Sequence, residues 1–261
     1  MKKYLYLMGA VTLVFAACSE VDKPAELRVP VALTYRTVQA VDTRAAQNLN
    51  DGQFSSGEAI AVRISNHGAG EWQAFEFTTG EAGAMVAGDP APFYPAGDTN
   101  IDIAACYPAS AGTSFSVQTD QTSDEAYKAS DLMFASVADQ AKQAGPVALT
   151  FSHIMARINV NITPGSGVSS IESVSILNVK PMLSFDPTTG MTGEADGSAT
   201  SIVITNDGAA LIPAQIIDGG LLSIVTDQGT AIYTVNNKVF EAGKQYTLKP
   251  PDGSRRIPLP C

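Results

Sequence analysis

Apolar and polar residues alternate along many short segments of this chain, which is the pattern of half-buried β-strands. The clearest case is 154–162, where one face carries Ile154, Ala156, Ile158, Val160 and Ile162 and the other carries Arg157, Asn159 and Asn161. The segment Leu27–Thr37 alternates in the same way, with Leu27, Val29, Val31, Leu33 and Tyr35 on one face. Both segments are therefore predicted to be strands with one buried face.

Two clusters of further strands are predicted, separated by turn-forming pairs such as Asp207-Gly208, Gly219-Gly220 and Asn236-Asn237. The first cluster comprises Glu58–Ser65, Gly70–Thr78, Met85–Ala87, Ile101–Tyr107, Ser114–Gln118 and Val147–Phe151. The second comprises Ile154–Ile162, Ile171–Val179, Met182–Phe185, Ser201–Thr205, Ala209–Ile212, Leu221–Thr226, Ile232–Val235 and Lys238–Phe240. The polar stretch Ser123–Lys142 is expected to be a loop with one helical turn. Short strands at this spacing indicate a sandwich or a barrel. Two sandwiches divided near Gly145–Val147 account for the length.

The beginning of the chain has the organisation of a bacterial lipoprotein export signal. Lys2 and Lys3 precede an apolar run, Tyr4–Phe15, which is too short to span a membrane as a helix. Ala16 and Ala17 then precede Cys18. Residues 1–17 are thus predicted to be a signal peptide, and Cys18 is predicted to carry the lipid. The alternative is an ordinary secretory signal that is cut nearby.

Residues 18–30 are interpreted as a tether, because two prolines and alternating charges leave too little apolar content for a packed element. Ser19, Glu20 and Asp22 follow the cysteine directly and resemble the surface-export signal of Bacteroides-group lipoproteins. The expected location is the outer membrane, on the cell surface.

The net negative charge of the chain argues against some classes of binding partner. The 261 residues include 26 acidic and 16 basic ones, for a net charge of −10, and loss of Lys2 and Lys3 makes the mature chain more acidic still. Such a balance disfavours nucleic acid and anionic membrane surfaces as partners.

Catalytic and metal-binding patterns are weak, so neither an enzyme nor a cofactor is expected. His67 is predicted to be a turn residue, and His153 a strand residue packed or hydrogen-bonded at the junction of the two domains. The triplet Gly165-Ser166-Gly167 lacks the spacing of a nucleophile elbow. The segment 186–196 is rich in oxygen ligands but lacks calcium-loop spacing. Cys106 is interpreted as a small buried strand residue, although a bridge to Cys261 is arithmetically possible.

Seven segments, in this order along 33–248, together resemble the fimbrillin family of Bacteroides-type bacteria. They are Phe54–Val62, Tyr94-Pro95, Ala105–Pro108, Phe115–Ser123, Tyr127–Met133, Val147–Ile158 and Phe240–Leu248. The resemblance implies an all-β lipoprotein precursor with two tandem antiparallel β-sandwich domains of the transthyretin-like, Greek-key type. It also implies assembly with other pilus subunits by protease-assisted strand exchange, in support of cell adhesion to a host or bacterial surface receptor.

The expected organisation is a signal peptide at 1–17, a tether at 18–30, an N-terminal sandwich at 31–146, a C-terminal sandwich at 147–249 and a proline-rich tail at 250–261. In the family, an arginine-specific protease cuts near the first strand, so the matching residues are Arg28, Arg36 and Arg44. Arg44 is favoured because it precedes the polar linker Gln47–Gly52, where backbone is expected to be exposed. The alternative is that Arg44 is an ordinary surface arginine.

The tail departs from the family pattern. Chains of the family continue with another strand that serves as donor, whereas here four prolines fall within the last thirteen residues, and proline removes ladder donors. This favours an anchor, a tip or a non-assembling relative over a main stalk subunit. The alternative function is that of a surface lipoprotein that binds glycan or host protein without polymerising. The single Trp72 gives little support to sugar stacking.

Overall fold

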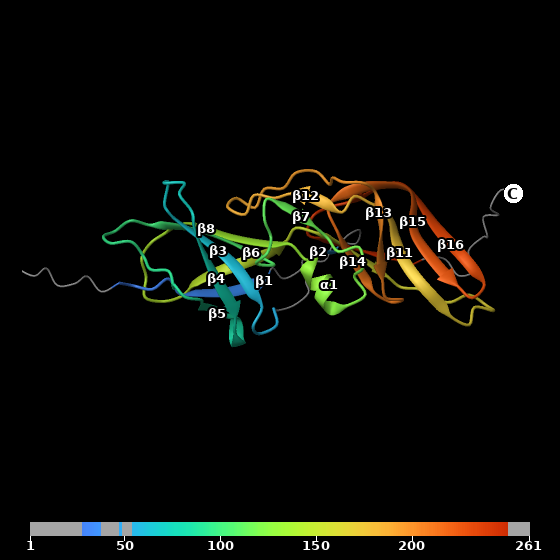
Figure 1. The fold of residues 1–261 in the computed structure, drawn as a ribbon, viewed down its shortest axis with the longest axis horizontal. Helices are drawn as coiled ribbons and strands as arrows, with labels where there is room; N and C mark the ends of the chain where they lie inside the picture. The colour runs from blue at the N-terminus through green and yellow to red at the C-terminus, as the bar shows by residue number, and fades with distance from the viewer. Residues whose placement is uncertain (1–27, 38–46, 49–53, 250–261) are drawn as a thin grey trace, which may run out of the picture.

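The computed structural model describes residues 28–37, 47–48 and 54–249. These residues form an elongated all-β molecule, with one closed barrel towards one end and several open sheets towards the other (Figure 1). None of the helices in the described ranges is long and apolar enough to cross a membrane.

The barrel contains seven strands in the order β1-β5-β4-β3-β6-β8-β9. Their bounds are β1 Leu33–Thr37, β3 Ala59–Asn66, β4 Gln73–Thr79, β5 Ala84–Ala87, β6 Ile101–Tyr107, β8 Met133–Gln140 and β9 Val147–His153. Neighbouring strands pair in antiparallel fashion except β1 and β9, which run parallel and close the ring. Alternate residues of each strand point inward, so the interior is filled by side chains such as Ile60, Val62, Ile103, Leu149 and Phe151.

Two four-stranded sheets make up most of the other half. One has the order β14 (Ala209–Ile212), β10 (Ala156–Val160), β17 (Lys244–Leu248) and β2 (Gln47–Asn48). The second has the order β13 (Thr200–Ile204), β11 (Ile171–Val179), β15 (Gln215–Thr226) and β16 (Gly229–Phe240). Buried residues of both sheets, including Ile158, Ile176, Leu222 and Tyr246, belong to one hydrophobic cluster. Burial of each such side chain contributes roughly 1.5–3 kcal/mol.

Three short elements lie outside these sheets. A two-stranded sheet pairs β7 (Ser114–Ser116) with β12 (Met182–Ser184). Helix α1 (Asp124–Ala129) begins at Ser123, whose Oγ accepts a hydrogen bond of 3.2 Å from the Ala126 amide. A single 3-10 turn, η1, covers Glu81–Gly83.

The domain boundary expected after residue 146 needs correction. Val147–His153 pairs with β1 and β8, and its buried residues belong to the barrel core, so the change from one core to the other follows His153. Phe115, Val117 and Leu132 join the second cluster instead of the first. Moreover, residues 33–153 contain a closed barrel with a parallel pair, where a purely antiparallel sandwich was expected. Local alternation predicts a strand but does not specify its partner, and the partner determines these assignments.

Two further expectations were wrong. The predicted loop at 123–142 contains its helical turn, but Met133–Gln140 is a strand with Met133 and Ala135 buried. Its apolar face was hard to detect because it includes a small alanine. Two predicted turns, at Gly219-Gly220 and Asn236-Asn237, lie within the paired strands β15 and β16 and cause shifts in their register. The chain reverses direction at Asp227-Gln228 instead.

Candidate assembly site

The first described strand, β1, is a buried part of the barrel. Val31, Leu33 and Tyr35 are buried, as their alternation predicted, and Val29 packs partly against the same core. On one side Leu33 and Thr34 pair with Met85 and Ala84 of β5 in antiparallel register. On the other side the whole of β1, from Leu33 to Thr37, pairs in parallel with β9. Removal of β1 would therefore open the ring and leave backbone edges on both β5 and β9.

The segment before β1 is held at the mouth of the barrel. The Val31 amide donates to the Pro92 carbonyl at 3.0 Å, and the Tyr94 amide donates to the Val29 carbonyl at 2.9 Å. The Arg28 guanidinium lies 4.7 Å from the centre of the Phe93 ring, which is within cation–π range. The segment from Arg28 to Leu33 is therefore held against the barrel by these contacts.

At the other end of β1, an aromatic cluster centred on Phe54 covers the core. The Phe54 ring lies 5.1 Å from Tyr35, 5.0 Å from Tyr107 and 5.3 Å from Phe151, centroid to centroid. The Tyr35 hydroxyl donates to the Phe54 carbonyl at 3.3 Å. Burial, with a smaller contribution from the Glu58 carboxylate, raises the pKa of Tyr35 above 10. Tyr35 is thus neutral at physiological pH and can donate this bond.

Gly83 allows η1 to approach the backbone of β1 closely. Its φ is +79°, and a Cβ at this position would lie 2.8 Å from the Tyr35 carbonyl oxygen. Both the backbone angle and the contact favour glycine here.

The arginines expected near the processing site differ in their surroundings. Arg36 lies within β1, where it is paired with Thr150, and its Nε donates to the Thr150 Oγ1 at 2.8 Å. A protease needs an extended, accessible backbone, so the ladder protects this peptide. Arg28 lies at the barrel mouth, before the buried strand. Cys18, Arg44 and the tail 250–261 lie outside the described residues, as does most of the linker 47–52. Gln47 and Asn48 pair with Gln245 and Lys244 of β17.

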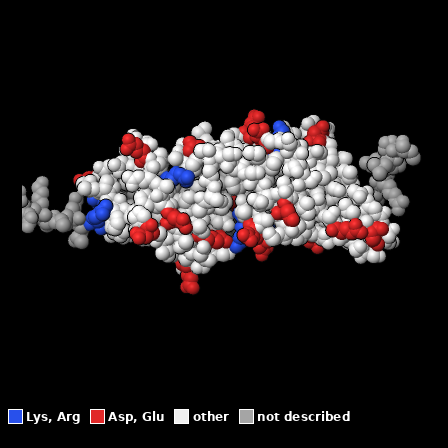
Figure 2. All heavy atoms as spheres, in the orientation of Figure 1, with Lys and Arg blue, Asp and Glu red and all other residues white. Residues whose placement is uncertain are grey.

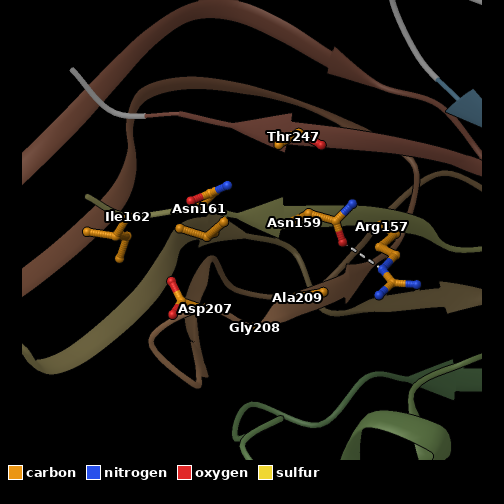
Figure 3. Close-up of a pocket in the computed structure, with 9 residues that line it drawn as sticks. Arg157, Asn159, Asn161, Ile162, Asp207, Gly208, Ala209 and Thr247 are labelled. Carbon is orange, nitrogen blue, oxygen red and sulfur yellow. Dashed lines mark hydrogen bonds between the residues drawn. The ribbon is translucent and has the colours of Figure 1, made fainter. Parts of the chain in front are cut away.

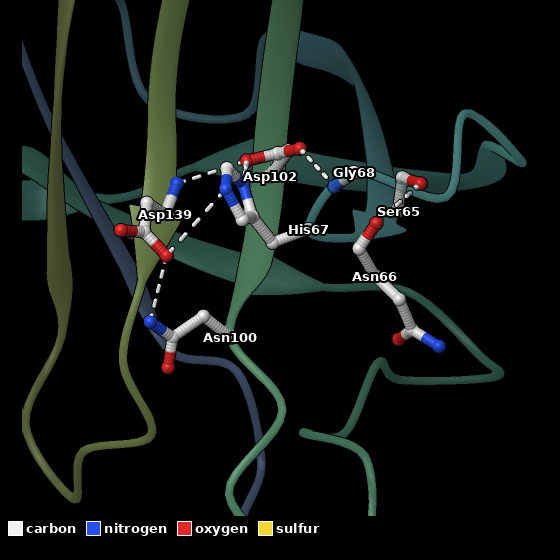
Figure 4. Close-up of polar contacts among 7 residues, drawn as sticks. All are labelled: Ser65, Asn66, His67, Gly68, Asn100, Asp102 and Asp139. Atoms are coloured by element: carbon white, nitrogen blue, oxygen red, sulfur yellow. Dashed lines mark hydrogen bonds and ion pairs between the residues drawn. The ribbon is translucent and has the colours of Figure 1, made fainter.

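His67 belongs to a polar cluster at one end of the barrel (Figure 4). Its Nδ1 lies 2.7 Å from the Asp102 carboxylate and its Nε2 lies 3.8 Å from Asp139. Asn100 donates to Asp139 at 2.7 Å. The hydrogen bond with Asp102 raises the pKa of His67 above 6.5. The cluster joins the turn after β3 to the beginning of β6 and the end of β8.

His153 lies where the two cores meet, as predicted. Its Nδ1 is 2.8 Å from the Asp131 carboxylate, and its Nε2 is buried with no hydrogen-bond partner. Its backbone carbonyl is 3.0 Å from where a Cβ on Gly243 would lie. Cys106, on β6, is fully buried as expected. Among the described residues, no three His, Cys, Asp or Glu side chains are grouped so that they could hold a metal ion.

A polar hollow of about 550 Å³ lies over the sheet formed by β14, β10 and β17 (Figure 3). Arg157, Asn159 and Asn161 line it from β10 and the residue after it, and Asp207 and Thr247 line it from the neighbouring strands and turn. The Arg157 Nε donates to the Asn159 Oδ1 at 2.7 Å, and the Arg157 guanidinium lies 5.7 Å from the Tyr127 ring centre. Burial lowers the pKa of Arg157 from its ordinary value. On the face of the molecule that Figure 2 shows, acidic side chains are more frequent than basic ones.

The chain belongs to the fimbrillin-like family, whose pattern it matches over residues 43–250. This confirms the family that the sequence resembled. No curated protein matches the chain.

Solved structures share the fold. A candidate cell adhesion protein from Bacteroides uniformis is 23% identical, with a TM-score of 0.66 over 85% of this chain and 92% of that one. A second candidate cell adhesion protein, from Bacteroides ovatus, is 15% identical, with a TM-score of 0.69 over 85% and 91% of the two chains. A fimbrial protein from Bacteroides ovatus is 14% identical, with a TM-score of 0.53 over 85% of this chain and 49% of that one.

Proposed function

We propose that this protein is a fimbrial subunit or accessory protein whose first strand is exchanged for a strand of a neighbouring subunit. It is exported as a lipoprotein anchored to the outer membrane through Cys18, and an arginine-specific protease cuts it at Arg44. The cut separates the lipid-bearing segment, together with β1, from the rest of the barrel. The partners are other pilus subunits, and the assembled fibre contacts a receptor on a host or bacterial surface.

The observation that carries this proposal is the position of β1 within a barrel of a fimbrillin-like chain. Val31, Leu33 and Tyr35 are buried, and β1 pairs with β9 over its whole length and with β5 at Leu33 and Thr34. At roughly 1.5–3 kcal/mol for each side chain, β1 is not lost spontaneously. An incoming strand with apolar residues at the same alternate positions would replace both the burial and the ladder. The similar proteins from Bacteroides, which are described as fimbrial or as candidates for cell adhesion, support the same role.

Arg44 remains the preferred processing residue. Arg36 is held in the ladder and hydrogen-bonded to Thr150, and a cut at Arg28 would leave Val31, Leu33 and Tyr35 in place. A cut after β1 frees the strand while the remaining six strands stay connected.

The test is limited proteolysis of the purified full chain with an arginine-specific protease, followed by electrophoresis of unheated samples in mild detergent. The wild type should give a single early cut and then oligomers, alone or with added donor-competent subunits. Arg44→Gln should stay uncut and form no detergent-resistant oligomers, whereas Arg36→Gln should behave as the wild type. If the clipped protein forms no detergent-resistant oligomers even with added subunits, strand exchange is wrong for this chain.

Lipid attachment is tested separately. Cells grown with a labelled fatty acid should label the wild type and not Cys18→Ser. Label retained by Cys18→Ser would refute the anchor without affecting the assembly proposal.

The polar hollow favours a second candidate function, the binding of a surface glycan without polymerisation. Its guanidinium, amides, carboxylate and hydroxyl offer both donors and acceptors to a hydroxyl-rich ligand. Asn161→Ala and Asp207→Ala should then abolish binding on a glycan array, and a wild type that binds no glycan would eliminate this candidate.

A further inference from the structure

The last strand of the second four-stranded sheet, β16, leaves one backbone edge open. Its twelve residues pair with β15 over their whole length, from Phe240 opposite Gln215 to Gly229 opposite Thr226. No described residue forms a ladder on its other side, and β16 stands last in the strand order. Figure 1 shows it along the outer margin of the sheet.

The edge strands β13 and β14 in this half of the molecule are covered. The Val203 amide of β13 donates to the Thr119 carbonyl at 2.8 Å, and the Gln121 amide donates to the Val203 carbonyl at 2.9 Å. The Gln121 side chain covers β14 in the same way. Its Nε2 donates to the Leu211 carbonyl at 2.9 Å, and its Oε1 accepts from the Leu211 amide at 2.8 Å. The segment 119–121 therefore protects two strands, and the described chain offers β16 nothing comparable.

Before the irregularity at Asn236-Asn237 and the charge of Lys238, the β16 edge lacks the usual features that prevent edge-to-edge association. Natural edges are blunted by charges, prolines or short length, yet Gly229–Asn237 has no charged residue and no proline. Ile232 is 49% exposed and Tyr233 is 37% exposed. Tyr233 lies opposite the buried Leu222 and Ile232 lies opposite Ser223, so the two side chains extend opposite faces of the sheet. An added strand would thus find apolar contacts on both faces.

We propose that β16 is an interface between two copies of this chain, in which β16 pairs antiparallel with β16 of the second copy across a two-fold axis. The occupant has to present an unpaired strand edge of similar length, and β16 is the long strand in the described chain that has one. The net charge of the chain also favours contact between two copies at this segment. The chain carries a net −10, and two copies repel least where they meet through an uncharged segment.

The same neutral segment fixes the register. Complete overlap of Gly229–Asn237 with its copy places the axis at Tyr233, so that Ile232 faces Thr234 and Ala231 faces Val235. Two sheets of four strands then become one continuous sheet of eight. The pairing needs no cleavage and involves a different sheet from β1, so it stands or fails independently of strand exchange.

Sedimentation equilibrium of the uncleaved full chain tests this interface, with Cys18→Ser present to keep the protein free of lipid. The wild type should form dimers, and Thr234→Lys and Ile232→Lys should each raise the dimer dissociation constant about tenfold or more, because the two lysines of a dimer then lie diagonally across the axis on one face of the joined sheet. Added salt should tighten the wild-type dimer by screening the net charge.

Val86→Lys is the matched control, since it places the same charge at a strand residue that is 59% exposed on the barrel. It should dimerise as the wild type does. Circular dichroism establishes that each variant is folded. A wild type that stays monomeric at the highest attainable concentration overturns the proposal, and so does a dimer unaffected by both lysines on β16.

Discussion

Tyr35 and Leu33 are the residues through which β1 is tied to the barrel core. Leu33 is 3% exposed and pairs with both Met85 and Val147, while Tyr35 contacts the Phe54 ring. Their burial follows from the alternation in the sequence. The residues that pair with or contact these two side chains come from three other parts of the chain. The local pattern of β1 does not indicate which residues these are.

Leu33→Ala should destabilise the folded protein by about 2–5 kcal/mol, because it removes buried atoms and leaves a cavity between β5 and β9. Equilibrium unfolding in denaturant measures this loss. Val86→Ala, on the exposed face of β5, should change the free energy of unfolding by less than about 0.5 kcal/mol. Equal effects of the two substitutions would contradict the placement of β1 in the core.

His67 should titrate above its ordinary pKa of 6.5, because its protonated ring is hydrogen-bonded to Asp102 and faces Asp139. A pKa raised by folding means that the ion pair stabilises the protein fully below the unfolded pKa, and that this contribution disappears as pH rises through the folded pKa. An NMR titration of the ring protons measures the value. Asp102→Asn should lower it towards 6.5, and an unchanged titration curve in that variant would refute the contact.

At the scale of elements, the covered edges of β13 and β14 depend on the segment 119–121. The Gln121 side chain, 4% exposed, imitates a strand by bonding both backbone groups of Leu211. Sequence patterns did not indicate this role, because a lone glutamine in a polar turn is usually solvated. Among the described residues nothing covers β16 in this way, so the two ends of the same sheet differ.

Gln121→Ala should destabilise the protein by about 1–3 kcal/mol, since it leaves the buried amide and carbonyl of Leu211 without partners. Amide hydrogen exchange at Leu211 should also become faster. Gln73→Ala, at an exposed position of β4, serves as the control and should leave both quantities close to the wild type. Slow exchange at Leu211 in the alanine variant would show that the glutamine does not cover this edge.

Strands with a strong apolar signal could be predicted from the sequence. Ile101–Tyr107, Ile171–Val179 and Ala209–Ile212 have the bounds that the pattern indicated. β8 was missed, because polar and charged residues dominate the stretch 123–142 in which its few apolar positions lie. In the β15–β16 hairpin the sequence instead predicted turns that do not exist. Its glycine and asparagine pairs indicated turns, but they form bulges within continuous strands.

At the scale of the whole molecule, the parallel pairing of β1 with β9 determines the architecture. It joins residues more than one hundred positions apart, closes the barrel and moves the change of core to the far side of His153. Such pairing depends on the complete fold, so the sequence predicted two strand clusters but not their division. The candidate site was predicted only in part for the same reason, with β1 indicated and its surroundings missed.

A reversible covalent lock on β1 tests whether assembly requires the release of the first strand. Thr34 and Ala148 are register partners on the outer face of the β1–β9 pair, so Thr34→Cys with Ala148→Cys should form a disulfide that holds β1 after the protease has cut at Arg44. A second pair, Thr78→Cys with Val86→Cys, joins β4 to β5 and provides the control.

Oligomer formation after cleavage, with donor-competent subunits present, is the measurement. We expect the oxidised β1–β9 variant to form no detergent-resistant oligomers, reduction to restore them, and the oxidised β4–β5 variant to assemble as the wild type does. Oligomers formed equally well by the oxidised β1–β9 variant would contradict the account, because assembly would then proceed without release of the first strand.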